Sequence, residues 1–229
     1  MKTKKVLPLV LVLALTPALF LFGRGKVESP RVLELRYGFT SEPVTLDPLD
    51  PSNTADGRSI LFNVYEGLVR LEPDGDLKPA AASSYGVEQG GLVYRFTLRR
   101  GLTFHDGSPV RVEDVKFTLD QAAASGYQGF SQIEKIETPD SSTIVITLKA
   151  PDVEFLPYIS VGVVPADNKD REKNPIGTGP YIIESYTTQQ SLVLKKNPAY
   201  WKAGFPKLDK VTIVFLSDSE ALLLSLRGG

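Results

Sequence analysis

The residues best suited to chemistry gather in one short stretch. His105 is the only histidine of the chain, and Asp106 and Ser108 follow it closely. A histidine changes its charge near neutral pH, so it can act as a general base or a metal ligand. The same stretch, with Gly107 and Pro109, also has strong turn chemistry. Two interpretations follow: a secreted hydrolase or peptidase that uses His105, and a turn histidine held by Asp106 or the backbone, which we favour.

Two other motifs have simple structural explanations. Glu113 and Asp114 could be paired acids, but they fall in the first turn of an expected helix, where acidic side chains suit the helix dipole. Gly177-Thr178-Gly179 could suggest a phosphate loop, but no Lys-Ser/Thr pair follows and Pro180 lacks an N–H. We therefore predict no catalytic residue.

The composition excludes several kinds of site. The chain has 229 residues, 42% hydrophobic and 23% charged, which is ordinary for a globular protein of one or two domains. It contains no cysteine and a single histidine, so disulfides are ruled out and little material remains for a zinc or copper site. The formal net charge of -1 gives no basic footprint for nucleic acid. We expect no cofactor, no metal and no nucleic-acid partner.

The first 26 residues have the layout of a secretory signal. Met1–Lys5 contains three lysines, and Val6–Phe22 carries no charge. The rival is an uncleaved anchor, but the run is shorter than the roughly 20 residues that span a bilayer comfortably, and Pro8 and Pro17 interrupt it. We predict that residues 1–26 are a signal peptide or N-terminal anchor and that the protein is exported.

Lipid attachment is not expected. Leu21-Phe22-Gly23 would suit the residues before a lipoprotein cysteine, but Arg24 stands where that cysteine would be. The chain would therefore contact a membrane only through its N-terminal segment or an importer.

The pattern of apolar residues predicts interleaved strands and helices, hence a mixed α/β fold with some hairpins. The predicted strands are 32–39, 92–99, 102–104, 143–148, 181–183, 191–195 and 210–215. The predicted helices are 59–71, 112–124 and 217–226, and residues 41–54 are expected to form a loop.

Several stretches together resemble the peptide-type extracellular solute-binding proteins, family 5, which include oligopeptide, dipeptide and nickel binders. The matching motifs follow in order along the chain: Glu42-Pro43, Leu46-Asp47-Pro48, Tyr65-Glu66-Gly67-Leu68, the stretch 77–85, Tyr94 to Gly101, Phe104 to Pro109, Glu113 to Phe117, Gly177 to Tyr181, and Asn197 to Trp201. Most of these are turn glycines, prolines and large aromatic residues, which we interpret as scaffold.

The resemblance implies a periplasmic-binding-protein-like (type II) fold with the small extra domain of the peptide binders. One lobe, seen in part, would comprise residues 27–64 and 165–229, and residues 65–164 would form the extra domain. The second lobe, which encloses the ligand in relatives, would be absent, so we expect a truncated form that does not bind solute tightly.

The implied function is that of the substrate-binding component of an ABC importer. Its partners would be a peptide or similar small solute and the permease subunits of the importer. It would work in the periplasm or cell envelope. A chaperone-like envelope protein that merely uses the fold is a further alternative.

The resemblance also places candidate ligand contacts. By position, Ser52, Asn53 and Thr54 correspond to residues that touch the ligand backbone in relatives, and Tyr127 and Phe130 flank the cleft. An extended peptide is gripped by backbone hydrogen bonds, which Asn53 and Thr54 can supply. The alternative is that Ser52 to Thr54 is a polar turn and that the two aromatic residues only pack.

Overall fold

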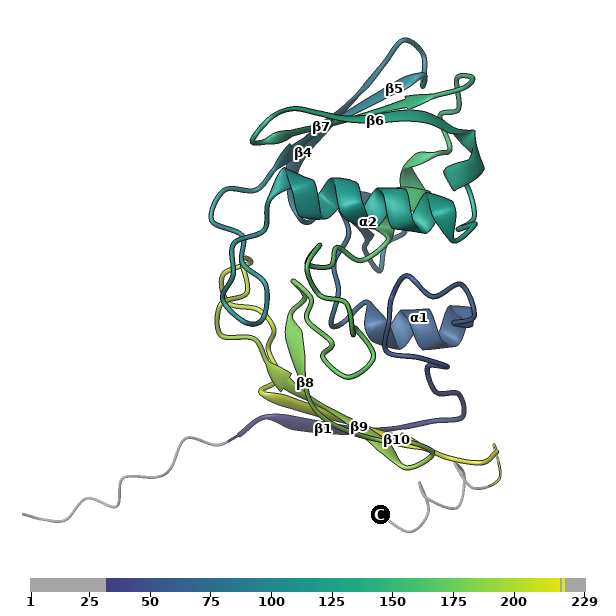
Figure 1. Cartoon of the computed structure of the whole chain (residues 1–229). Helices are drawn as coiled ribbons and strands as arrows, with labels where there is room; N and C mark the ends of the chain where they lie inside the picture. Colours follow the sequence, from purple (N-terminus) through teal and green to yellow (C-terminus); the bar gives the residue numbers. More distant parts are fainter. Residues whose placement is uncertain (1–31, 219, 221–229) are drawn as a thin grey trace, which may run out of the picture. The chain divides into compact units, whose positions relative to one another are not determined.

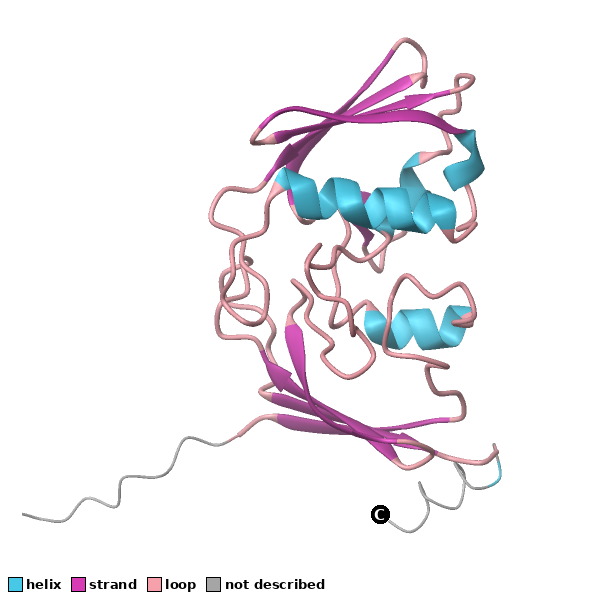
Figure 2. Ribbon diagram, viewed as in Figure 1, coloured by secondary structure: helices cyan, strands magenta, loops and turns pink. Residues whose placement is uncertain are grey.

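The computed structural model describes residues 32–218 and residue 220. Within them, two four-stranded sheets carry most of the fold (Figure 1, Figure 2). The first, here the terminal sheet, has the strand order β1-β10-β9-β8; β1 runs parallel to β10, and the other neighbours are antiparallel. The second, here the inserted sheet, is antiparallel with the order β4-β5-β7-β6. The terminal strands are β1 (Glu34–Phe39), β8 (Tyr181–Thr187), β9 (Ser191–Lys196) and β10 (Lys210–Phe215); the inserted strands are β4 (Ala82–Glu88), β5 (Val93–Leu98), β6 (Ile133–Asp140) and β7 (Thr143–Leu148).

The inserted sheet is built on alternating apolar residues. One face of its two central strands carries buried side chains, namely Tyr94, Phe96, Leu98, Ile144, Ile146 and Leu148. Helix α2 (Val112–Ala124) lies along this sheet (Figure 1) and contributes Val115, Leu119 and Ala122 to the same core. Each large apolar side chain buried in this way stabilises the fold by roughly 1.5–3 kcal/mol.

The start of α2 accounts for the acidic pair. One oxygen of Asp114 accepts the Arg111 N–H at 2.9 Å, which caps the helix, and the other accepts the Ala166 N–H at 2.9 Å. The helix bounds and the N-terminal role of these acids are therefore as predicted.

The two sheets are joined through a junction of closely spaced backbones. The segment 63–68 follows α1 without forming a helix or a strand. Two returning segments bond to it: Val163 N–H donates to the Glu66 carbonyl and Gly179 N–H to the Val64 carbonyl, each at 2.9 Å. A Cβ on Gly177 would lie 2.2 Å from the Val64 carbonyl oxygen, so only glycine allows this approach. The Gly177-Thr178-Gly179 motif is thus part of the scaffold.

The predicted strands that correspond to β1, β5, β7, β8, β9 and β10 are confirmed. The predicted helix 59–71 is wrong in its bounds, because α1 spans Ala55–Leu61 and Thr54 caps it by accepting the Gly57 N–H at 3.1 Å. Residues 102–104 contribute a single bridge between Thr103 and Pro109 instead of a strand. The edge strands β4 and β6, and the short pair β2 (Val69–Leu71) and β3 (Leu77–Pro79), were not predicted. Two 3₁₀ turns, η1 (Phe130–Gln132) and η2 (Leu156–Ser160), complete the elements.

Two predictions fall outside this description. The signal segment 1–26 lies outside the described residues, as does most of the predicted helix 217–226. In residues 32–218 and 220, no helix combines the length and apolar character needed to cross a membrane.

Candidate functional site

The ring of His105 is held by the backbone. Its Nδ1 accepts the Gly177 N–H at 3.3 Å, so the proton resides on Nε2, which donates to the Gly179 carbonyl at 3.1 Å. Burial lowers the pKa of His105, which keeps the ring neutral. Asp106 instead accepts the N–H and hydroxyl of Ser108, at 2.9 and 2.7 Å. The backbone-held interpretation is therefore confirmed, and the His-Asp-Ser stretch does not assemble a triad.

A second polar cluster is also occupied internally. The buried carboxylate of Glu66 accepts the Tyr200 hydroxyl at 2.5 Å and the Trp201 indole N–H at 2.6 Å, and pairs with Arg70 at 3.4 Å. The Arg99 guanidinium lies 3.7 Å from the centre of the Trp201 ring, a cation–π contact. Burial raises the pKa of Glu66, and these hydrogen bonds oppose the rise. The packing role predicted for Tyr200-Trp201 is confirmed. Among the described residues, no group of three acids or histidines is placed to hold a metal.

A cavity of about 310 Å³ lies where α1, the end of α2 and η2 meet; we call it the α1–α2 cavity. Its lining combines aromatic rings, aliphatic groups, backbone at glycines, and a few polar side chains, which is the usual make-up of a small-molecule site. The lining residues are Pro48, Pro51, Arg58, Leu61, Phe62, Tyr65, Gly126, Tyr127, Gln128, Pro157, Tyr158, Ser160, Val161 and Gly162.

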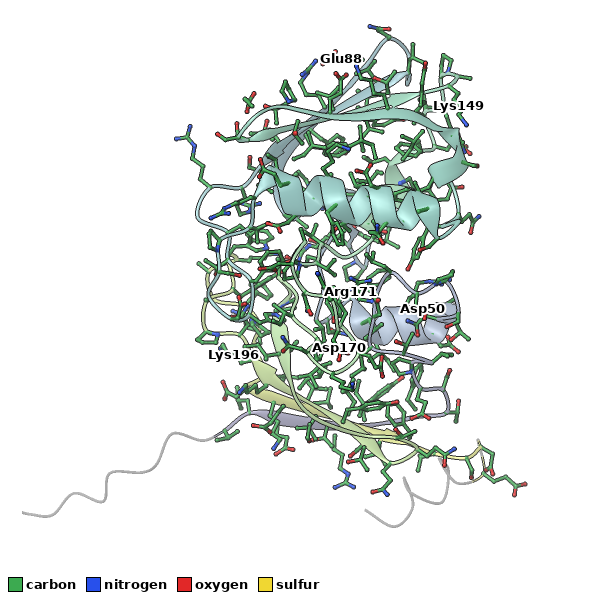
Figure 3. The ribbon with its side chains drawn as sticks, in the orientation of Figure 1. Asp50, Glu88, Lys149, Asp170, Arg171 and Lys196 are labelled. Atoms are coloured by element: carbon green, nitrogen blue, oxygen red, sulfur yellow. The ribbon has the colours of Figure 1, made fainter. Side chains whose placement is uncertain are left out.

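The loop that closes one side of the cavity is fixed by Asn53. Its amide nitrogen donates to the carbonyls of Thr45 and Asp47 at 3.1 and 3.0 Å, and its oxygen accepts the Thr45 N–H at 3.3 Å. Asp47 also forms a two-point ion pair with Arg171, with 2.8 Å contacts. Arg171 and Asp50, both labelled in Figure 3, come from the loops beside α1. The loop is therefore held in place before any ligand arrives.

The predicted contact residues have different surroundings. Tyr127 lines the cavity and donates its hydroxyl to the Pro48 carbonyl; burial raises its pKa, and the charge of Arg58 opposes this. Phe130 is buried behind Tyr127, with ring centres 6.1 Å apart. Ser52 is exposed and outside the lining.

Asn53 and Thr54, as described above, bond to the chain itself. Of the five predicted residues, the cavity includes Tyr127 alone. That any of the five contacts a ligand stays a prediction.

Other lining residues were not foreseen. Arg58 lies in α1, Tyr65 follows shortly after it, and Tyr158 lies in η2, which was not predicted at all. Tyr65 donates its hydroxyl to the Leu46 carbonyl at 3.1 Å, which ties the segment after α1 to the loop before it. The one sequence signal available was a charged residue, Arg58, beside the apolar positions of an expected helix.

A second hollow of about 540 Å³ lies between the 172–176 loop, His105 and β8. Its lining includes the charged residues Asp106, Glu172, Lys173 and Glu184 together with several aliphatic side chains. We take the α1–α2 cavity as the candidate site because aromatic rings and backbone groups converge there.

Comparison with known proteins agrees with this description. The family model of bacterial extracellular solute-binding proteins, family 5 Middle, matches residues 76–229. The glutathione-binding protein GsiB of Salmonella choleraesuis is 34% identical over 201 residues, covering 81% of this chain and 38% of that protein. The chain thus spans about two fifths of the length of such curated relatives.

Solved structures of binding proteins have the same fold. AgaA from A. tumefaciens, in complex with agropinic acid, has a TM-score of 0.78 and 34% identity over 86% of this chain and 42% of its own. DppA from Helicobacter pylori, in complex with the peptide STSA, has a TM-score of 0.74 and 27% identity over 86% of this chain and 45% of its own. These matches confirm the predicted mixed α/β, periplasmic-binding-protein-like (type II) fold. The chain belongs to the bacterial extracellular solute-binding proteins, family 5.

Proposed function

We propose that this chain belongs to the substrate-capturing component of an ABC importer and that it takes up peptides or solutes of similar size in the α1–α2 cavity. The observation that carries the proposal is this cavity, set in a fold that over 86% of the chain matches AgaA in complex with agropinic acid. Relatives named for glutathione and for a bound peptide support the same solute class.

We also propose export, with permease subunits as partners. The Lys-rich start and uncharged run of residues 1–26 support export, and Arg24 supports the absence of a lipid anchor. The division into residues 27–64 with 165–229, and 65–164, is supported by the strands of the inserted sheet, which fall between Ala82 and Leu148.

Binding is preferred to turnover because the ring nitrogens of His105 are engaged with the backbone. Within the site, we propose that Tyr127 contacts the solute directly and that Phe130 supports its ring. The loop Ser52 to Thr54 would offer backbone groups, since Asn53 and Thr54 already use their side chains.

A binding panel tests the proposal. The full chain is mixed with di- to pentapeptides and small organic acids, and thermal unfolding and ligand-observed NMR are recorded. A solute present at 100 times its Kd stabilises the fold by about 2.7 kcal/mol. Gln128 is exposed at the cavity, so the larger side chain of Gln128→Trp should fill the cavity and abolish the rise in unfolding temperature that the solute causes. Gln190→Trp, an equal change on the exposed β8–β9 turn, should not.

The proposal is contradicted if no solute of the panel binds, even with millimolar affinity. It is also contradicted if Gln128→Trp binds solute as well as the unaltered chain does.

A further inference from the structure

One cation in the α1–α2 cavity has no counter-ion in the described part of the protein. Arg58 is half-buried and forms no ion pair with any carboxylate in residues 32–218 and 220. One guanidinium nitrogen donates to the Asn53 carbonyl. The guanidinium also interacts with the neighbouring Tyr127 hydroxyl. Because a guanidinium has five N–H donors, it can still donate to a further partner.

Acidic residues of the neighbouring loop do not neutralise Arg58. Asp47 is paired with Arg171 at 2.8 Å, and Asp50 accepts the Ser52 N–H at 2.8 Å. Neither carboxylate lines the cavity, and among the residues that the structure describes Arg58 is the only charged one in its lining. The cavity therefore presents a net positive charge.

The rest of the lining favours a ligand that is partly apolar. Phe62 is 49% exposed although it is large and hydrophobic, and Tyr158 presents a second ring. A charge pair next to such groups is less screened than one in water, so it contributes more to binding. Arginine also matches the two oxygens of a carboxylate with two parallel hydrogen bonds.

We propose that the solute held in the α1–α2 cavity presents a carboxylate to Arg58 and an apolar or aromatic portion to Phe62 and Tyr158. This inference rests on the proposed function and narrows its solute class. The volume of about 310 Å³ suits a short peptide or a small organic acid. The carboxylate can belong to a peptide C-terminus or to an acidic side chain, since the recognition is the same.

Matched pairs of probes test the inference. Glycyl-phenylalanine and glycyl-phenylalaninamide differ in that the carboxylate of the first is a neutral amide in the second; glycyl-leucine and its amide form another pair, and acetyl-aspartate with its diamide form a third. Each is titrated against the full chain and against Arg58→Gln, Arg58→Lys and Arg100→Gln. Arg100 is exposed and is not part of the cavity, so it serves as the control.

In every pair that binds, we expect the acid to bind about tenfold or more tightly than the amide, as one charge-assisted hydrogen bond can provide. Arg58→Gln should reduce this preference to about twofold or less, mainly by lowering the affinity for the acid. Arg58→Lys should keep part of the preference, because the charge remains without the fork of donors. Arg100→Gln should keep all of it. Unfolding curves of each variant establish that the fold is retained.

Several results would overturn the inference and leave the proposed function standing: equal affinity for acid and amide, a preference that survives Arg58→Gln, or binding of carboxylate-free solutes alone. If no probe and no solute of the wider panel binds the unaltered chain, both the inference and the proposed function fail.

Discussion

Replacing Asn53 separates a scaffold role from a ligand role at the loop before α1. Its side chain is 2% exposed and makes three hydrogen bonds to the backbone of Thr45 and Asp47. Asn53→Ala leaves these backbone groups unpaired, which costs about 1–3 kcal/mol. A domain of this size loses about 2–4 °C of Tm per kcal/mol, so we expect a fall of about 2–12 °C.

Asn53→Asp is the sharper variant. It keeps the size of the side chain but sets a carboxylate against two carbonyl oxygens that now receive N–H groups at 3.1 and 3.0 Å. We expect a loss at least as large as that of Asn53→Ala, since an unpaired buried charge is costly. Ser52→Ala, at an exposed neighbour, should change the unfolding free energy by less than about 0.5 kcal/mol.

Urea unfolding, together with titration of a solute that binds, gives the answer. If Asn53→Ala unfolds within about 0.5 kcal/mol of the unaltered chain while its solute affinity collapses, then Asn53 acts on the ligand and the scaffold argument is refuted.

Three further changes follow from the junction and the polar clusters. Gly177→Ala forces a Cβ to 2.2 Å from the Val64 carbonyl oxygen, so we expect a loss above about 4 kcal/mol or no soluble protein, judged by expression and unfolding. His105→Ala should cost about 2 kcal/mol. Burial lowers the pKa of His105, so the neutral ring contributes stability that is present above pH 6.5 and is lost at lower pH. The His105→Ala substitution should also remove this pH-dependent part of the stability. Burial raises the pKa of Glu66, so the stability of the unaltered chain relative to Glu66→Gln should fall as pH rises above 4.5; a flat difference between the two urea-unfolding profiles would contradict this.

Periodicity predicted the central strands, which have a neighbouring strand on each side in their sheet. In β5 and β7, apolar and polar residues alternate because one face of each strand is buried, and the same rule gave β9 and β10. The edge strands β4 and β6 were not predicted because β4 is mostly exposed, β6 has no fully buried residue, and neither strand shows a clear alternation. Charged side chains are tolerated there since an edge strand has a neighbour on one side only.

The predicted helix 59–71 shows where the spacing of apolar residues misleads. Ile60, Leu61, Val64 and Leu68 are all buried at helical intervals, but the helix ends at Leu61. Val64 and Leu68 are buried because backbone from residues 160–181 packs around the segment that follows α1. This is a long-range effect that no local pattern reports.

The site was harder to predict than the fold for the same reason. Tyr127, which the family resemblance suggested by position as a ligand contact, lines the candidate cavity, and its contact with a ligand stays a prediction. Arg58 could not be singled out from the sequence. The role proposed for it depends on the absence of a paired carboxylate around its guanidinium in the described residues. That is a property of the packed loops and not of the spacing.

Photo-crosslinking tests the central claim, solute capture in the α1–α2 cavity, most directly. The tightest-binding solute of the panel is prepared with a diazirine group, irradiated with the full chain, and the labelled peptides are mapped by mass spectrometry. We predict labels on the peptides that contain Tyr127 and Tyr158, removed by an excess of unlabelled solute and by Gln128→Trp. Competable labels confined to segments that do not line the cavity would contradict the account.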